Sequence, residues 1–204
     1  MGLWSERVVP FITDKACNTK EVRPYRARQC ADLQGDVLEI GFGSGHTIEY
    51  LPETVHELCA VEPSDRARRY AAPRIAASPI PVRYGGLDGQ RLELPDDHFD
   101  GAVSTCTLCT IPDAVAALRE VRRVLKPGGT FHFLEHGRSP DPKVARAQQR
   151  WDPFQRRLFA GCHVSRPIAD LIEEAGFRIE RLENSQLKGP KLFGYLYEGV
   201  AVAP

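Results

Sequence analysis

Two hydrophobic periods alternate along this chain, one typical of strands and one typical of helices. Short apolar runs, bounded by glycine, proline or charged residues, predict strands at seven places. They cover residues 37–40, 57–61, 82–84, 99–105, 130–134, 177–182 and 193–202. Helical spacing is clearest after Asp113, a candidate cap, with apolar side chains at Ala114, Ala117, Leu118, Val121, Val124 and Leu125.

Further helices are expected between these strands. The pattern favours residues 21–33, 46–51, 64–77 and 165–175, with Ser64 as the cap of the third. The Pro-Gly-Gly sequence at residues 127–129 should end the helix that follows Asp113. Strands that alternate with helices predict an α/β fold with a mainly parallel sheet and helices on both faces. The last two strands should close the sheet in antiparallel fashion.

Length and charge limit the kinds of partner. The 204 residues, of which 42% are hydrophobic, suffice for one well-buried domain, so a single domain over residues 1–204 is expected. Lys and Arg together number 27, as do Asp and Glu. A net charge near zero supplies no long-range attraction to nucleic acid or to a membrane surface. We therefore expect a small-molecule substrate and neither of those partners, and the sequence leaves the oligomeric state open.

The cysteines indicate the compartment. Six of them, at positions 17, 30, 59, 106, 109 and 162, are scattered through strand and helix patterns and are not spaced like a disulfide scaffold. The opening residues lack the basic and apolar blocks of a signal peptide, and no run reaches the length of a transmembrane helix. A cytoplasmic location is expected.

The clearest candidate site follows the first predicted strand, where Gly41, Gly43 and Gly45 stand at alternate positions. A residue without Cβ lets a ligand approach the backbone closely, and a helix that begins near Gly45 would aim free amide donors at it. His46 occupies the sixth position, where a dinucleotide fingerprint requires glycine. The turn therefore favours a nucleoside cofactor over a pyrophosphate cradle, with an ordinary tight turn as the alternative.

Other candidates follow later strands. Glu62 comes where a doubly wound fold places its ribose-binding carboxylate, although a surface acid ahead of a helix would look the same. Thr105 and Cys106 end the fourth strand and should face a ligand beyond it. Zinc usually takes four protein ligands, and no second close pair accompanies Cys106 and Cys109, so no metal is expected. That pair is interpreted as small buried thiols.

The last third of the chain carries candidate substrate chemistry. His136 follows the fifth strand, and its imidazole titrates near neutral pH, so it can act as a base or serve as a structural histidine. Residues 149–166 are aromatic, basic and thiol-bearing, and an insertion over residues 140–165 is expected to cover the active site. Alternatively, Trp151 and its apolar neighbours form one face of an ordinary helix.

Several motifs together resemble those of class I S-adenosylmethionine-dependent methyltransferases. They lie at residues 38–45, 61–63, 87–89, 94–100 and 125–129. The resemblance implies the Rossmann-like fold of that class, with a seven-stranded, mainly parallel sheet, and S-adenosyl-L-methionine as cofactor. It implies that Asp88 accepts the adenine amino group and that the Gly89 amide meets the ring. The full set of implied cofactor residues is Glu39, Gly41, Gly43, Gly45, Glu62, Asp88, Gly89, Thr105 and Cys106.

Within that class, residues 133–136, 161–163 and 193–195 resemble the type-11 group, which includes the alkyl-thiol methyltransferases of animal membranes. This implies methylation of sulfur in a small thiol or dithiol, by direct in-line transfer. A base such as His136, or positive charge from Arg150, Arg156 or His163, would favour the thiolate. In this class an amino-terminal segment, here residues 1–33, commonly folds over cofactor and substrate. Tyr25, Trp151 and Cys162 are the candidate substrate contacts.

Other functions stay open at this point. The same motifs occur in O- and C-methyltransferases of phenolic, quinone-type and related metabolites. A nicotinamide-dependent oxidoreductase is disfavoured by the glycine spacing and by the lack of an obvious Tyr-x-x-x-Lys pair. A cofactor-binding protein without turnover would retain the binding motifs. The apolar amino-terminal anchor of the animal proteins is not found in this sequence, so a membrane location is not expected.

Overall fold

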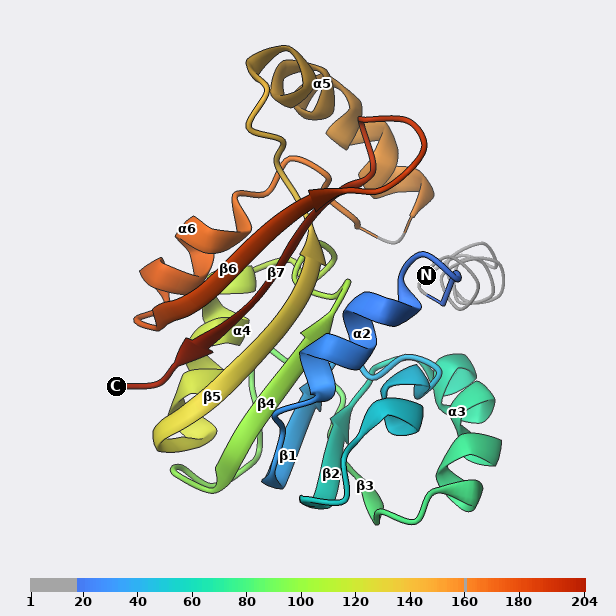
Figure 1. Cartoon of the computed structure of the whole chain (residues 1–204), viewed down its shortest axis with the longest axis vertical. Helices are drawn as coiled ribbons and strands as arrows, with labels where there is room; N and C mark the ends of the chain where they lie inside the picture. Colours follow the sequence, from blue (N-terminus) through green and yellow to red (C-terminus); the bar gives the residue numbers. More distant parts are fainter. Residues whose placement is uncertain (1–17, 160) are drawn as a thin grey trace.

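The computed structural model describes residues 18–159 and 161–204, so most of the predicted cap over residues 1–33 lies outside the described residues (Figure 1). Among the described residues, seven strands form one sheet in the order β3-β2-β1-β4-β5-β7-β6. Strands β1 to β5 pair in parallel, and β7 is antiparallel to both β5 and β6. The strands are β1 Gly35–Ile40, β2 Val55–Val61, β3 Val82–Gly86, β4 Phe99–Thr105, β5 Leu125–His136, β6 Arg178–Gln186 and β7 Tyr195–Val202.

Helices occupy the connections between the strands. They are α2 Arg23–Cys30, a short 3-10 helix His46–Tyr50, α3 Asp65–Ala77, α4 Ala114–Val124, α5 Pro142–Leu158 and α6 Ile168–Glu174. The predicted caps are confirmed. The Ser64 side chain accepts a hydrogen bond from the Ala67 N–H at 3.2 Å, and the Asp113 carboxylate accepts one from the Ala116 N–H at 2.9 Å.

The sheet is buried on both faces. Leu38 in β1 belongs to an apolar cluster with Leu118 of α4 and Ile172 of α6. Its neighbour Val37 belongs to a second cluster with Cys30 of α2 and Ala71 of α3. Because adjacent strand residues point to opposite faces, helices cover both faces of the sheet. The predicted seven-stranded, mainly parallel α/β fold is confirmed.

Several element boundaries differ from the prediction, and for two of them the structure shows the reason. The helix expected from residue 165 begins at Ile168, because the Ser165 hydroxyl donates to the Asp152 carboxylate and does not cap the helix. Strand β5 begins at Leu125, before the Pro-Gly-Gly sequence expected to precede it. The Gly128 N–H donates to the Ala203 carbonyl at 2.8 Å, so the chain end beside β7 holds this segment against the sheet.

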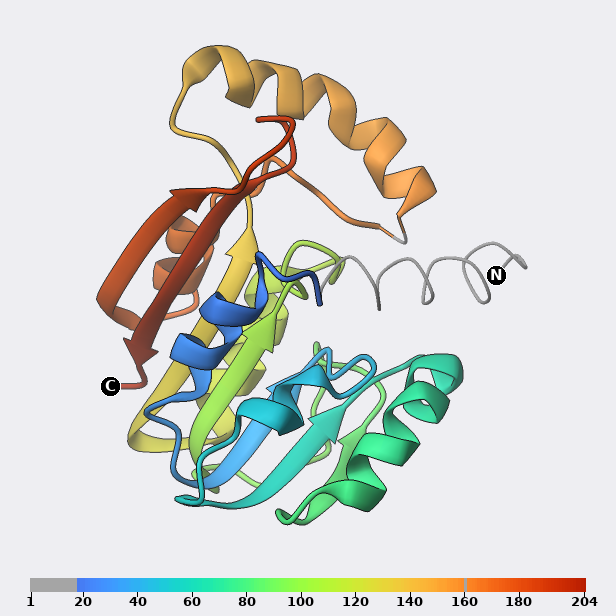
Figure 2. The same ribbon diagram turned by 45° about the vertical axis from the view of Figure 1, so that its right-hand side comes forward.

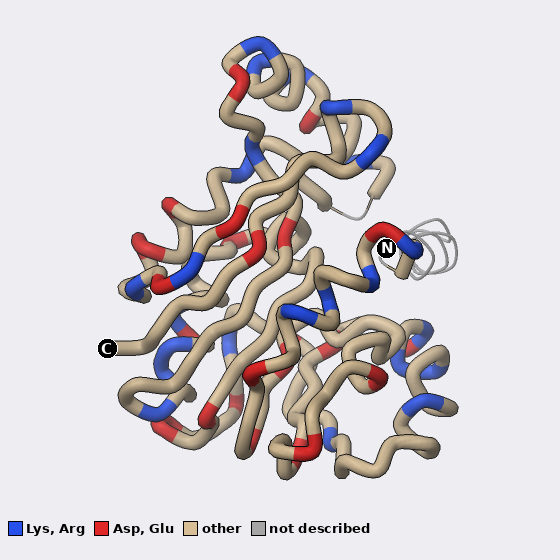
Figure 3. Tube along the Cα trace, in the orientation of Figure 1, with Lys and Arg blue, Asp and Glu red and all other residues tan. Residues whose placement is uncertain are grey.

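The strand order indicates the end of the sheet at which a ligand of this fold binds. Strand β1 lies between β2 and β4, so the strand order reverses there, and ligands of such sheets bind beyond the carboxyl ends at that point. In both views α5 lies beyond the carboxyl end of β5 (Figure 1 and Figure 2). Positively and negatively charged residues are distributed along the whole described chain (Figure 3). Within the described part of the chain, no helix combines the length and apolar character needed to cross a membrane.

Candidate active site

The glycine turn after β1 meets the loop after β4 without room for a side chain. Gly41 has a φ of +69°, and a Cβ there would collide with the Thr107 side chain. The Thr107 hydroxyl in turn donates to the Thr105 carbonyl at 3.1 Å. Glycine at position 41 therefore allows two loops to come together at the strand ends, where the sequence predicted a cofactor.

Glu62, at the end of β2, holds the same turn from the other side. Its carboxylate accepts hydrogen bonds from the Gly43 N–H and the Ser64 N–H, both at 2.8 Å. Burial raises the pKa of Glu62, while these two donors act in the opposite direction. The carboxylate thus shapes the turn, and its contact with a ribose stays a prediction.

Glu39 is a buried carboxylate inside β1. Its Oε1 accepts a hydrogen bond from the Thr47 hydroxyl at 2.6 Å, and the Arg26 guanidinium donates to that hydroxyl at 3.0 Å. Its Oε2 is buried without a hydrogen-bond partner among the described residues. Desolvation raises the pKa of Glu39 to about 8. A buried carboxyl oxygen that lacks a partner is a suitable site for a polar group of a ligand.

Asp88 and Gly89 follow β3. Asp88 is exposed, and its Oδ1 accepts a hydrogen bond from the Gln90 N–H at 2.9 Å, which is the local turn interaction expected of Asp-Gly. A Cβ on Gly89 would lie 3.5 Å from Ile111 and 3.9 Å from Ile40. The pair therefore lies beside the end of β1, where an adenine contact was predicted.

Thr105 and Cys106 end β4. The Thr105 hydroxyl donates to the Gln29 side chain of α2 at 2.9 Å, so its hydrogen already has an acceptor. Cys106 has a φ of +53°, an uncommon conformation for a residue other than glycine. Such outliers cluster at functional sites.

Glu135 joins the ends of β4 and β5. This fully buried carboxylate accepts hydrogen bonds from the Ser104 hydroxyl at 2.7 Å and from the Thr107 N–H at 2.9 Å. Burial raises the pKa of Glu135. Sequence reasoning overlooked this residue. The sequence feature that could have identified it is an acidic residue at the end of a largely apolar strand.

Beyond the ends of β4 and β5, the structure brings together Cys109, His136 and Cys162. Their sulfur and imidazole nitrogen atoms all lie within 4.8 Å of one another. The Cys162 Sγ is 3.4 Å from the His136 Nε2. Burial alone would lower the pKa of His136, but the contact with Cys162 raises it to about 9. Contacts with Cys109 and then His136 lower the pKa of Cys162.

Comparisons with known proteins identify the family of this chain. The sequence profile of the methyltransferase domain matches residues 38–133. Thiol S-methyltransferase TMT1B of Rattus norvegicus is 31% identical over 167 residues, which are 76% of this chain and 67% of that protein. The chain belongs to the S-adenosylmethionine-dependent methyltransferases. This methyltransferase is also 29% identical over 176 residues to human thiol S-methyltransferase TMT1A, covering 78% of this chain and 69% of its relative.

Solved structures confirm the fold of the methyltransferase. An S-adenosylmethionine-dependent methyltransferase from Mesorhizobium loti superimposes with a TM-score of 0.68 at 19% identity, over 92% of this chain and all of that one. Membership of the S-adenosylmethionine-dependent methyltransferases gives S-adenosyl-L-methionine as the cofactor and sets aside the nicotinamide-dependent oxidoreductase. The unpartnered oxygen of buried Glu39 and the open space beside Gly43, where a Cβ would meet only the Gly41 carbonyl at 3.8 Å, fit that cofactor.

Hydrogen bonds link the predicted catalytic residue His163 and the predicted substrate residue Trp151 of the methyltransferase to the cluster. His163 is next to Cys162, and its Nδ1 lies 3.2 Å from the Cys109 carbonyl. Trp151 of α5 donates to the Gln155 side chain at 3.1 Å, and the Gln155 amide is 3.8 Å from the Cys162 sulfur. Tyr25 lies on α2, where the Arg28 guanidinium stacks 4.7 Å from its ring centroid.

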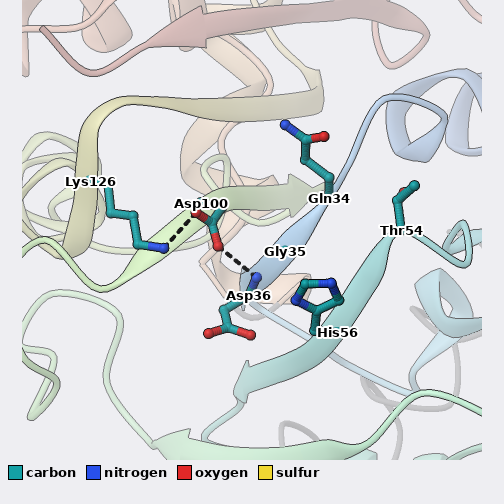
Figure 4. Close-up of a pocket in the computed structure, with 7 residues that line it drawn as sticks. All are labelled: Gln34, Gly35, Asp36, Thr54, His56, Asp100 and Lys126. Atoms are coloured by element: carbon teal, nitrogen blue, oxygen red, sulfur yellow. Dashed lines mark hydrogen bonds and ion pairs between the residues drawn. The ribbon is translucent and has the colours of Figure 1, made fainter.

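A separate pocket of about 550 Å³ lies at the amino ends of the central strands (Figure 4). It is lined by Gln34, Gly35, Asp36, Thr54, His56, Asp100 and Lys126. Asp100 pairs with Lys126 at 2.6 Å and accepts a hydrogen bond from the Asp36 N–H at 2.9 Å. These polar groups form hydrogen bonds and an ion pair with one another at the amino ends of β1 and β4. The methyltransferase site is therefore assigned to the carboxyl ends of the strands.

Proposed function

We propose that this methyltransferase transfers the methyl group of S-adenosyl-L-methionine to the sulfur atom of a small thiol or dithiol. The observation that carries the proposal is the cluster of Cys109, His136 and Cys162 beyond the ends of β4 and β5. The loop after β4, which carries Cys109, contacts the glycine turn, because the Thr107 hydroxyl donates to the Gly41 carbonyl at 3.4 Å. Glu135 ties the same loop to the end of β5. The names of the animal relatives support the same acceptor.

The residues of this chain have separate tasks in the proposal. Glu62 keeps the glycine turn in shape, Glu39 offers a buried carboxyl group, and Asp88 binds the adenine. The bound cofactor supplies a methyl group that is already electrophilic on its sulfonium. The protein therefore has to align the acceptor, exclude water and favour the ionised sulfur.

A thiol is suited to this site because its ordinary pKa is about 8.5, so little stabilisation is needed to form a thiolate. His136 is the candidate catalytic residue, with His163 beside it. The Arg166 guanidinium adds positive charge nearby, held by the Ile111 carbonyl at 2.6 Å and the Pro112 carbonyl at 3.0 Å. A carbon acceptor would demand a stronger base.

The test is transfer of labelled methyl from S-adenosyl-L-methionine to alkyl thiols, a reduced dithiol, phenols and a quinone precursor, with product masses recorded. We expect thioether products, and about tenfold or greater loss of turnover in His136→Ala with cofactor affinity retained. Methylation of phenol oxygen or ring carbon alone would refute the sulfur acceptor. Cofactor binding with no product from any acceptor class would favour a binding protein without turnover.

A further inference from the structure

We infer that Cys109, His136 and Cys162 form a zinc site whose fourth position receives the acceptor sulfur. The metal site stands on the geometry alone, whereas the role of its fourth position rests on the proposed thiol methylation. The sequence predicted no metal, because Cys106 and Cys109 have no second close pair. The fold supplies the further ligands from the end of β5 and from the loop after α5.

The distances suit tetrahedral coordination. Zinc binds thiolate sulfur at about 2.3 Å and imidazole nitrogen at about 2.0 Å, which separates ligand atoms by about 3.5 to 3.8 Å. The Cys162 Sγ and the His136 Nε2 are 3.4 Å apart, and the three ligand atoms all fall within 4.8 Å. Small side-chain rotations therefore bring the cluster to zinc geometry.

The backbone holds two of the ligands together before any metal binds. The His163 N–H donates to the Cys109 carbonyl at 2.7 Å, which joins the loop of Cys162 directly to that of Cys109. Asp152 of α5 accepts the Val164 N–H at 2.9 Å and the Ser165 hydroxyl, so the helix anchors the same loop. A pre-formed set of ligands costs little conformational entropy when the ion enters.

The chemistry of the ligands selects the ion. Two thiolates and an imidazole favour zinc and other thiophilic ions over magnesium and calcium, which prefer oxygen. Catalytic zinc sites use three protein ligands and keep one position for water or substrate, while structural sites use four. Among the described residues, this cluster has three such ligands.

Charge balance accommodates a third sulfur. Two cysteine thiolates neutralise Zn²⁺, so a substrate thiolate leaves one net negative charge in the site. Arg166 supplies a compensating positive charge, because its guanidinium is held against the loop that carries Cys109 through the Leu108, Ile111 and Pro112 carbonyls. A neutral methylated product is a weaker ligand than the thiolate and leaves readily.

The reaction balances without a change in oxidation state. The substrate S–H bond breaks as the sulfur binds zinc, and the proton passes to solvent. A sulfur electron pair then forms the new bond to the methyl carbon. The bond from that carbon to the sulfonium sulfur breaks, and its electron pair stays on the cofactor, which leaves as S-adenosylhomocysteine. The thioether dissociates, and water takes the open position.

The first experiment measures metal in untagged full-length protein after dialysis, by elemental mass spectrometry. We expect about one zinc per chain, and about tenfold or greater weakening of zinc affinity in Cys109→Ser and Cys162→Ser. Cys59→Ala is the matched control, because Cys59 is buried in β2 and outside the cluster. Circular dichroism checks that each variant is folded. Wild-type protein that binds no zinc, even when zinc is supplied, would overturn the site.

The second experiment replaces zinc with cobalt and records the visible and near-ultraviolet spectrum. Thiolate-to-cobalt charge transfer and tetrahedral ligand-field bands are expected, and a thiol substrate should intensify the charge-transfer band. Chelated enzyme should lose thiol methylation and regain it with zinc, while calorimetry shows unchanged cofactor affinity. Full thiol methylation without zinc would overturn the role of the metal and leave the proposed function standing. A zinc-bound protein that methylates no thiol would refute the proposed function and leave the metal site.

Discussion

At the scale of the residue, Asp88 and Glu62 show two ways in which a carboxylate can serve a cofactor site. Glu62 is buried and holds the backbone of the turn, whereas Asp88 is exposed and bonds within its own turn. Loss of Glu62 would therefore disturb both fold and binding. Asp88 is the cleaner probe of cofactor recognition.

Asp88→Ala should weaken S-adenosyl-L-methionine binding by about tenfold, because one hydrogen bond to the cofactor is worth about 1 to 2 kcal/mol. Its melting temperature should stay close to that of the wild type. Isothermal titration calorimetry measures the affinity, with Glu180→Ala as an exposed control in β6. Equal affinities in Asp88→Ala and wild type would remove Asp88 from the cofactor map.

Gly41→Ala should destabilise the protein by about 2 to 4 kcal/mol, since it adds a left-handed backbone cost to a steric clash with Thr107. Gly128→Ala is the matched control. Its φ is +79° but a Cβ there meets no atom within 4 Å, so only the backbone cost of about 1 to 2 kcal/mol applies. Urea denaturation measures the free energy of unfolding of both variants. Equal losses of stability would show that the Thr107 side chain moves aside without a measurable penalty.

At the scale of the element, α5 acts through the loop that follows it. Asp152 reaches past the helix end to the Val164 N–H and the Ser165 hydroxyl, and so fixes the segment that carries Cys162. Asp141 caps the other end of the same helix, where it accepts the Lys143 N–H at 2.8 Å. Asp152 therefore affects the position of Cys162, whereas Asp141 affects only the stability of the helix.

Asp152→Ala should raise the KM for a thiol acceptor by about tenfold, because a loosened loop misplaces Cys162. Cofactor affinity should not change, since the glycine turn lies on other loops. Asp141→Ala removes the cap and should cost about 1 kcal/mol of stability with little effect on KM. Steady-state kinetics at saturating cofactor make the comparison, and matching KM values for both variants would count against an anchoring role for Asp152.

The strands and caps were predictable because they depend on neighbours in the sequence, as the alternation of Val37 and Leu38 between two cores shows. The loops that carry the proposed cofactor residues were expected from short motifs, and their contacts with the cofactor stay predictions. The sulfur cluster was not, since Cys109, His136 and Cys162 meet only after strand order and loop paths are set. Ser165 misled the prediction of a helix start because a distant carboxylate, on Asp152, takes its hydroxyl.

At the scale of the whole molecule, Glu39 couples stability to pH. Its carboxyl pKa is about 8 in the folded protein, against an ordinary value of 4.5. A raised pKa means that the folded state keeps a proton that the unfolded state releases. Stability is therefore reduced as pH rises from about 4.5 to 8 and changes little outside that interval.

Glu39→Gln should remove this dependence. Without cofactor, the variant should gain stability over wild type on going from pH 5 to pH 8, by on the order of 1 to 3 kcal/mol. Chemical denaturation at both pH values measures the difference. Glu53→Gln, at an exposed position, is the control and should show no such trend. If the difference in free energy of unfolding between Glu39→Gln and wild type is the same at both pH values, Glu39 has an ordinary pKa.

The order of the loops along the chain divides the labour of the site. The proposed cofactor contacts end at Cys106, while two of the three cluster residues and the whole of α5 follow residue 135. A lineage or an engineer can therefore exchange residues 140–165 for another insertion and leave the methyl-donor half untouched. Acceptor selectivity can therefore change through this one insertion, while the part of the fold that binds the cofactor stays the same.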